Sequence, residues 1–190
     1  YFSNLSHPFR PGYKQTLYVY YINKKLFHKN SQLWNQVKTS IYQEARSKVF
    51  NPRLTSFRAE PDMLYIVLNS KKGERAAVFV RNSGTENKIG VNLRGPMKSA
   101  AKLNCIGEKC IRVLLSSMKD FENNLCKLEE DILNQLIHGS NSKTKLKFKK
   151  PVGNRVLLEM GKQDLIKLTE NGHALTSLGK WYLSMSKIKK

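Results

Sequence analysis

A polar stretch of the chain, VFVRNSGTENKIGVNLRG (residues 78–95), separates two apolar runs and gathers groups that bind phosphate. Arg81 can present a bidentate guanidinium fork, and Ser83 and Thr85 can donate hydroxyl protons. Gly84 lets backbone N–H groups approach an anion closely, and Lys88 adds a second positive charge. These five residues are a candidate phosphate-binding site. The alternative is a polar hairpin turn with Arg81 in solvent and Glu86 paired to Lys88.

The elements around this turn can be predicted from the spacing of apolar residues. Helical spacing favours helices at residues 31–50 and 95–121, with Ser31 as a candidate N-cap of the first. Strand-like runs of β-branched and aromatic residues lie at 15–25, 62–70, 76–82 and 88–95. This order predicts an α+β fold with an antiparallel four-stranded sheet and two helices on one face.

The turn and its flanking strands resemble a signature of the α-D-phosphohexomutases, the superfamily of phosphoglucomutase, phosphomannomutase and phosphoglucosamine mutase. In the C-terminal domain of that family, Arg-x-Ser-Gly-Thr-Glu-Pro-Lys-Ile-Arg-Val lies between two strands. The residues in step with it here are Arg81, Ser83, Gly84, Thr85, Glu86, Lys88, Ile89 and Val91. The resemblance covers about residues 15–121. It implies that the turn binds the phosphate of a phosphosugar.

The chain departs from the family pattern at three positions. Asn82 and Asn87 stand where prolines are frequent, and Gly90 stands where an arginine is frequent. Prolines stiffen a loop because they fix φ, so this turn is expected to be looser and less positively charged than its counterparts.

The catalytic parts that the family resemblance would require are not recognisable in this chain. Mutases of the family use a phosphoserine and Mg²⁺ held by clustered aspartates, whereas the acidic residues here are scattered. Converging carboxylates are needed for a Mg²⁺ site. We therefore predict no catalytic residue, no metal site and no cofactor in this chain. Mg²⁺ is expected only in upstream domains of a larger mutase-like parent protein.

The C-terminal part is predicted to be a separate, mostly helical module. It contains an amphipathic helix at residues 122–139, a short helix within 154–164, a hairpin at Glu170–Gly172 and a helix beginning near Ser177. Its ending resembles the wing and last helix of winged-helix domains. The basic segment within it is a nucleic-acid candidate, with lysines at Lys143, Lys145, Lys147, Lys149 and Lys150.

Three regions follow from these observations: a linker at 1–14, the phosphohexomutase-like domain at 15–121 and the basic module at 122–190. The formal net charge of +20 is large, and the excess of Lys and Arg is found in both domains. A phosphosugar does not require that much charge, whereas a nucleic acid would use it. The alternative is that the lysines only solvate the surface. The tyrosines of YVYYINKK, residues 18–25, are predicted to pack in the sheet rather than to stack on bases.

The cysteines and the absence of long apolar runs set the expected location. Cys105, Cys110 and Cys126 show neither a disulfide framework nor a CxxC metal pattern. No apolar run approaches the ~20 residues that a membrane-spanning helix needs. A reducing, cytoplasmic compartment is expected, with no membrane partner. Two functions stay open: a phosphosugar-binding domain that is not catalytic on its own, or a non-enzymatic protein that binds nucleic acid or a ribonucleoprotein.

Overall fold

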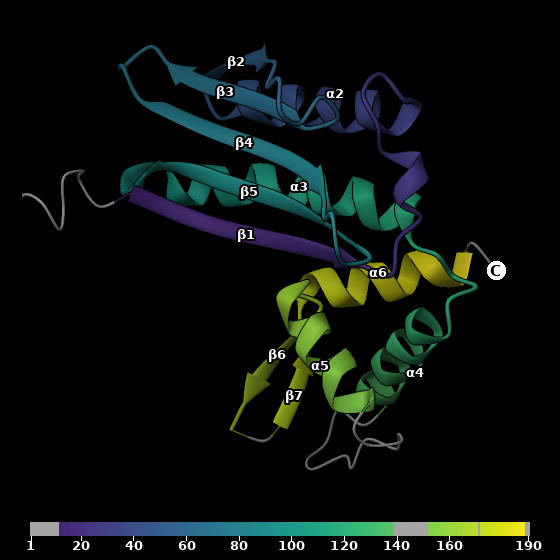
Figure 1. Ribbon diagram of the computed structural model, residues 1–190. Helices are drawn as coiled ribbons and strands as arrows, with labels where there is room; N and C mark the ends of the chain where they lie inside the picture. The colour runs from purple at the N-terminus through teal and green to yellow at the C-terminus, as the bar shows by residue number, and fades with distance from the viewer. Residues whose placement is uncertain (1–11, 139–151, 171, 189–190) are drawn as a thin grey trace, which may run out of the picture. The chain divides into compact units, whose positions relative to one another are not determined.

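A computed structural model describes residues 12–138, 152–170 and 172–188. These residues have an α+β fold, with a five-stranded antiparallel sheet, a two-stranded hairpin and five α-helices (Figure 1). The chain divides into two compact units. Unit 1 comprises Tyr1–Thr16, Phe27–Arg81 and Gly90–Cys110, and unit 2 comprises Leu17–Leu26, Asn82–Ile89 and Ile111–Lys190.

The large sheet has the strand order β1-β5-β4-β3-β2. Its strands are β1 (Gly12–Tyr20), β2 (Phe50–Thr55), β3 (Leu64–Ser70), β4 (Arg75–Asn82) and β5 (Lys88–Pro96). The antiparallel register sets Thr55 opposite Tyr65, and Tyr65 opposite Phe79. Since side chains alternate between the two faces of a sheet, this row and the row of Leu54, Ile66 and Val78 lie on opposite faces. Ile66 and Val78 of the second row are fully buried.

The predicted four-stranded sheet was wrong by one strand, because β2 was missed. Its sequence, FNPRLT, includes Pro52, which has no backbone N–H to donate to a neighbour. A proline is tolerated in a sheet on an edge strand, and β2 is the last strand in the order. The predicted first strand also ends early, at Tyr20, since Tyr21 adopts a positive φ of 56° that leaves the strand conformation.

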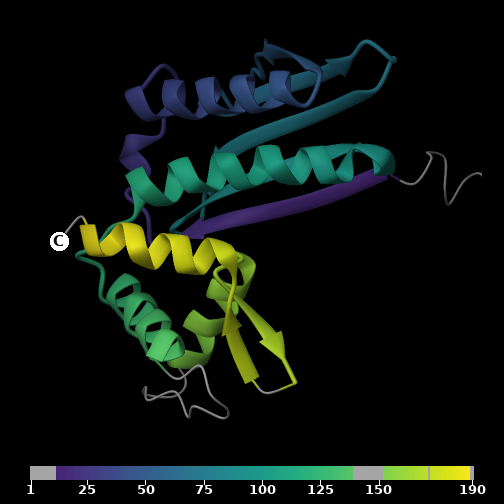
Figure 2. The same cartoon turned by 180° about the vertical axis from the view of Figure 1, so that it is seen from behind.

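Both helices of the predicted domain are confirmed. Helix α2 (Gln32–Ser47) begins after Ser31, whose side chain accepts from the Trp34 N–H as an N-cap. Helix α3 (Ala100–Met118) follows a 3₁₀ turn, η2 (Met97–Ser99). Figure 2 shows α2 and α3 on the same face of the sheet. They bury an apolar layer that includes Val37, Ile41, Ile66, Val78, Leu103 and Ile106. Within unit 1, no helix among the described residues covers the other face of the sheet.

Unit 2 contains the later helices and the hairpin. Its elements are the 3₁₀ turn η1 (Lys24–Leu26), α4 (Asn124–His138), α5 (Val152–Lys162), β6 (Ile166–Thr169), β7 (Gly172–Leu175) and α6 (Ser177–Ile188). The predicted hairpin is confirmed by antiparallel pairing of β6 with β7. The predicted final helix begins at Ser177. The lysines from Lys143 to Lys150 lie outside the described residues.

None of the helices in the described ranges has the length and apolar character needed to cross a bilayer. Tyr20 is only 3% exposed in β1, in agreement with the prediction that it packs in the sheet, whereas Tyr21 is equally buried but lies beyond the strand. The predicted division at residue 121 and the winged-helix resemblance stay predictions.

Candidate functional site

Arg81, the predicted phosphate fork, lies at the end of unit 1 and engages a carboxylate of its own chain. Its Nη1 donates to Oε1 of Glu60 at 2.6 Å. Both side chains are substantially exposed, so this is a surface ion pair of the kind that contributes about 0–1 kcal/mol. An incoming dianion therefore has only a weak contact to displace at Arg81.

The turn from Asn82 to Lys88 belongs to unit 2, and Ser83 closes it. The Ser83 N–H donates to the carbonyl of Lys88 at 2.9 Å, and the Ser83 hydroxyl accepts from the Glu86 N–H at 3.2 Å. Gly84 and Thr85 are exposed at the tip. A Cβ added to Gly84 would meet nothing within 4 Å. Thus the fold itself does not require glycine at position 84.

Two lysines hold this turn. Lys24 Nζ donates to the carbonyl of Ser83 at 2.6 Å, and Asn82 donates its amide to the carbonyl of Lys24 at 3.2 Å. Lys88 pairs with the Glu86 carboxylate. Its Nζ also lies 4.6 Å from the ring centroid of Tyr18 and 5.4 Å from that of Tyr20. The tyrosine rings and Glu86 thus fix the position of a lysine that is only 15% exposed.

Basic side chains of α5 contribute to the positive electrostatic potential at the same turn. The hydrogen bond from Lys88 holds the pKa of Glu86 below its usual value, and the charges of Lys88, Lys162 and Arg155 lower it further. Burial is the largest single effect on Lys88 and lowers its pKa, but the bond to Glu86 together with attraction from Tyr20, Glu86 and Tyr18 outweighs it, so the pKa of Lys88 is raised. The Glu86 carboxylate therefore occupies a position where the potential favours an anion.

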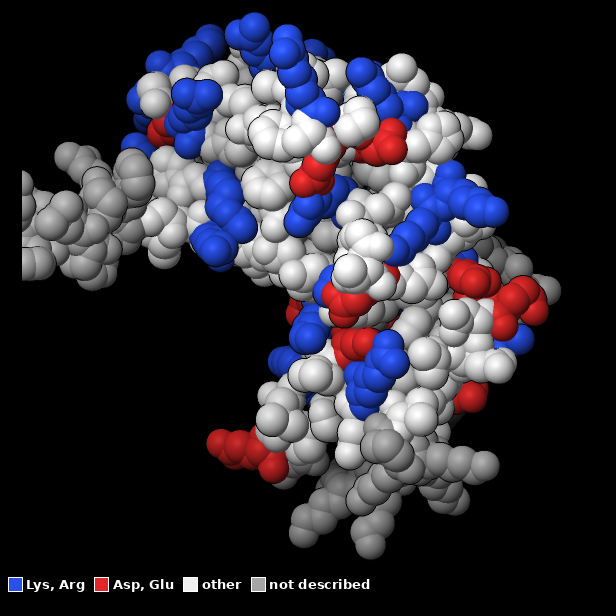
Figure 3. Space-filling view, viewed as in Figure 1, with Lys and Arg blue, Asp and Glu red and all other residues white. Residues whose placement is uncertain are grey.

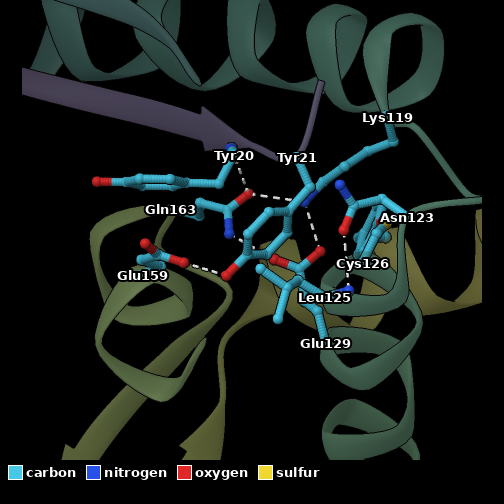
Figure 4. A network of polar contacts seen from close by, with 10 residues as sticks. Tyr20, Tyr21, Lys119, Asn123, Leu125, Cys126, Glu129, Glu159 and Gln163 are labelled. Carbon is cyan, nitrogen blue, oxygen red and sulfur yellow. Dashed lines mark hydrogen bonds and ion pairs between the residues drawn. The ribbon is translucent and has the colours of Figure 1, made fainter. Parts of the chain in front are cut away.

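A buried polar network lies within the same unit (Figure 4). Lys119 follows α3 and pairs with Glu129 of α4, and both side chains are fully buried. Lys119 Nζ also donates to Oε1 of Gln163 at 2.9 Å. That same oxygen accepts from the Tyr20 N–H at 3.1 Å, while the Gln163 amide donates to Glu129. Each charged group in this network therefore has more than one partner.

Tyr21 connects the network to the turn. A positive φ is unusual for a bulky residue, and three hydrogen bonds hold Tyr21 in it. Its hydroxyl donates to Glu159, its N–H donates to the carbonyl of Asn87 at 2.9 Å, and its carbonyl accepts from the Asp120 N–H at 2.8 Å. Arg155 Nε donates to the other oxygen of Glu159 at 3.0 Å. The α5 side chains thus position the segment that carries the turn.

Burial sets the protonation of these groups. It raises the pKa of Tyr21 and Tyr182, so both hydroxyls stay protonated. It also raises the pKa of the Glu129 carboxyl, an effect that Lys119 partly offsets. Burial raises the pKa of the Cys126 thiol to about 11, which leaves it without nucleophilic character near neutral pH. The network is suited to positioning, not to proton transfer or attack.

The sequence predicted the turn but not the network that supports it. Lys119 and Glu129 look like ordinary surface charges in the sequence, and Gln163 was given no role. Tyr21, which was predicted to lie inside the first strand, offered one signal, because a tyrosine hydroxyl in a packed region needs a polar partner. Over the described ranges, no group of His, Cys, Asp or Glu side chains is arranged to hold a metal ion.

Comparison with family models, with curated proteins and with solved structures finds no match to this chain. The function must therefore be argued from the geometry of the turn and from the charges around it.

Proposed function

We propose that the turn from Asn82 to Lys88 binds the phosphate of a phosphosugar, and that the chain is not catalytic on its own. The observation that carries this proposal is that Lys88, held over the rings of Tyr18 and Tyr20, pairs with the exposed carboxylate of Glu86 in the turn. The bond from Lys88 lowers the pKa of that carboxyl, and the charges of Lys162 and Arg155 add to the effect. A phosphate dianion placed there would take over the contacts that the carboxylate now makes. The resemblance to the C-terminal domain of the α-D-phosphohexomutases supports the same assignment.

The side chains of the turn have specific roles in this proposal. Lys88 supplies the charge nearest the phosphate, and the tyrosine rings beneath it keep it in place. The Ser83 hydroxyl accepts from Glu86 N–H and still has its own proton to donate to a phosphate oxygen. Thr85 and the backbone of Gly84 are exposed and can add donors. Arg81 would exchange Glu60 for a phosphate oxygen. No metal or cofactor is assigned to the chain.

Isothermal titration calorimetry with glucose 1-phosphate, glucose 6-phosphate, glucose and inorganic phosphate tests the proposal. Binding that requires the phosphate is expected, because charge-assisted hydrogen bonds to it each contribute about 1.5–3 kcal/mol. Replacing Lys88 by Met or Ser83 by Ala should weaken it at least tenfold. Lys25→Ala is the matched control, since Lys25 is exposed and adjacent to Lys24. Equal weakening by Lys25→Ala, or no effect of Lys88→Met and Arg81→Ala, would contradict the proposal.

Nucleic-acid or ribonucleoprotein binding is the second candidate function, and the net charge of +20 favours it. The winged-helix resemblance of the C-terminal module points the same way, and the confirmed hairpin and helix α6 are consistent with it. Its candidate contacts are Lys143, Lys145, Lys147, Lys149 and Lys150. A salt titration of nucleic-acid binding tests this second function. Variants in which these lysines are replaced by neutral residues should bind nucleic acid more weakly than the parent chain and with a smaller salt slope. We propose a reducing, cytoplasmic location, supported by the three free cysteines.

A further inference from the structure

The open face of the large sheet, defined as the strand side chains that point away from α2 and α3, has an unusual charge pattern. The five strands contain no Asp or Glu. Every Lys or Arg in them stands at a position whose side chain points to this face, as the alternation of side chains along a strand requires. Within unit 1 these residues are Lys14, Arg53, Arg75, Arg81 and Arg94. Figure 3 views this side of the sheet and shows Lys and Arg side chains spread over it, with fewer Asp and Glu side chains among them.

Most of these cations have no acidic partner in the described part of the chain. Arg81 pairs with Glu60, but Arg53 and Arg75 are exposed and form no ion pair with a described residue. Arg94 donates to the backbone carbonyls of Gln15 and Leu93 and leaves its charge uncompensated. The open face is therefore complementary to a polyanion rather than to another mixed-charge surface.

Two partly exposed aromatic rings lie at the middle of this face. Tyr65 and Phe79 are register partners on β3 and β4, with ring centroids 6.0 Å apart and an edge-to-face angle of 86°. The guanidinium of Arg94 lies over the Phe79 ring at 5.6 Å. Aromatic rings in strands usually pack under a helix or a second sheet, whereas these lie on the uncovered face. An aromatic pair bordered by arginines can stack on bases while the cations bind phosphates.

A hollow of about 620 Å³ is lined in part by Thr55, the register partner of Tyr65. Its lining includes Arg53, Thr55, Asn69 and Arg75, which offer hydrogen-bond donors, a hydroxyl and an amide, but no carboxylate. Its volume lies in the range of sites for small organic ligands, so it can hold one nucleotide unit beside a base that stacks on Tyr65 or Phe79.

We infer that the open face binds single-stranded nucleic acid, with bases on Tyr65 and Phe79 and the backbone on Arg53, Arg75 and Arg94. Single strands are favoured over duplexes because the rings can stack only on bases that are unpaired and splayed outwards. None of these five residues belongs to the proposed phosphosugar site or to the lysines of Lys143–Lys150, and the inference depends on neither.

Fluorescence anisotropy of the full chain tests it, using a dye-labelled ten-nucleotide RNA, the DNA of the same sequence, its duplex and polyphosphate. Three double variants are compared after circular dichroism has shown that each is folded. Arg53→Ala with Arg75→Ala removes charge from the open face. Tyr65→Leu with Phe79→Leu removes the stacking rings but keeps apolar bulk. Arg46→Ala with Lys109→Ala is the charge-matched control, because both residues are exposed on α2 and α3.

The arginine variant should bind the single strand at least tenfold more weakly, with a salt slope smaller by about 1.4, since each phosphate contact on a single strand contributes roughly 0.7 to the slope. The aromatic variant should bind it roughly 5- to 100-fold more weakly with an unchanged salt slope, and should bind polyphosphate normally. Binding of either RNA or DNA single strands with this dependence supports the inference. Equal losses in the α2/α3 control, equally tight duplex binding, or an aromatic variant that binds like the parent would overturn it.

Discussion

Lys119 Nζ donates to the Glu129 carboxylate at a point where neither side chain has any exposure to solvent. Removing one partner of a buried pair leaves the other charge uncompensated, which is far more costly than losing an exposed pair. We therefore expect Lys119→Met to lower the free energy of unfolding by about 3–5 kcal/mol. Urea denaturation followed by circular dichroism measures it.

Lys127→Met is the matched control, because Lys127 forms an exposed pair with Glu122 at 3.5 Å. Its loss should be below about 0.5 kcal/mol. The double variant Lys119→Met, Glu129→Leu should recover part of the lost stability, since no buried charge is then left alone. Similar effects of Lys119→Met and Lys127→Met would show that the network does not stabilise the unit.

Two glycines of unit 2 give opposite expectations for the same substitution. A Cβ on Gly179, in α6, would lie 2.1 Å from the backbone carbonyl oxygen of Leu165, whereas one on Gly161, in α5, would meet nothing within 4 Å. Gly179→Ala should cost about 2–3 kcal/mol through overpacking. Gly161→Ala should stabilise by about 0.5–1 kcal/mol, because alanine loses less backbone entropy in a helix. Thermal unfolding of the two variants tests both signs, and two shifts in one direction would contradict the prediction.

Removing the carboxylate of Glu86 should strengthen anion binding at the turn. Glu86 competes for Lys88, and its carboxylate is the exposed partner of this pair, so an anion can displace it at low cost. Glu86→Gln should therefore raise phosphate affinity roughly two- to fivefold. Calorimetric titration with inorganic phosphate measures this, and Glu122→Gln, at another exposed glutamate, is the control. Weaker binding after Glu86→Gln would mean that the carboxylate organises the site instead of occupying it.

Cys126 should make stability fall at alkaline pH. Burial raises its thiol pKa from 9.0 to about 11 in the folded chain. A raised acid pKa favours folding below the unfolded value, and that contribution is lost as pH rises from about 9 towards 11. Comparing urea midpoints of the parent and Cys126→Ala at pH 8 and pH 10 isolates this effect. The parent should lose more stability than the variant over that range, and parallel losses would contradict the assignment.

Features that depend on local chemistry were predictable from the sequence. Ser31 is a recognisable N-cap because its side chain has to satisfy an N–H in the first turn of α2. The start of α6 at Ser177 likewise follows from a hairpin turn and apolar helical spacing. Strand β2 was missed because it contains Pro52, and a proline is acceptable in a strand only at the edge of a sheet. Whether a strand lies at an edge depends on how all the strands pair, which the local sequence does not show.

Features that depend on distant residues could not be predicted in this way. Nothing near Lys119 in the sequence distinguishes it from an exposed lysine, because its burial depends on Gln163, 44 residues away. The candidate turn combines features of both kinds. Ser83 and Lys88 were predicted from spacing, whereas the competition from Glu86 and the charge of Arg155 and Lys162 emerge only after folding.

The left-handed backbone conformation of Tyr21 has a consequence for how the chain folds during synthesis. Its hydroxyl partner, Glu159, is made 138 residues later. At a translation rate of 5–20 residues per second, that interval is roughly 7–28 s. Throughout it, the nascent chain holds an aromatic residue in a costly backbone conformation, or leaves the end of β1 unformed. The end of β1 is therefore completed only by a side chain of α5, which is synthesised much later.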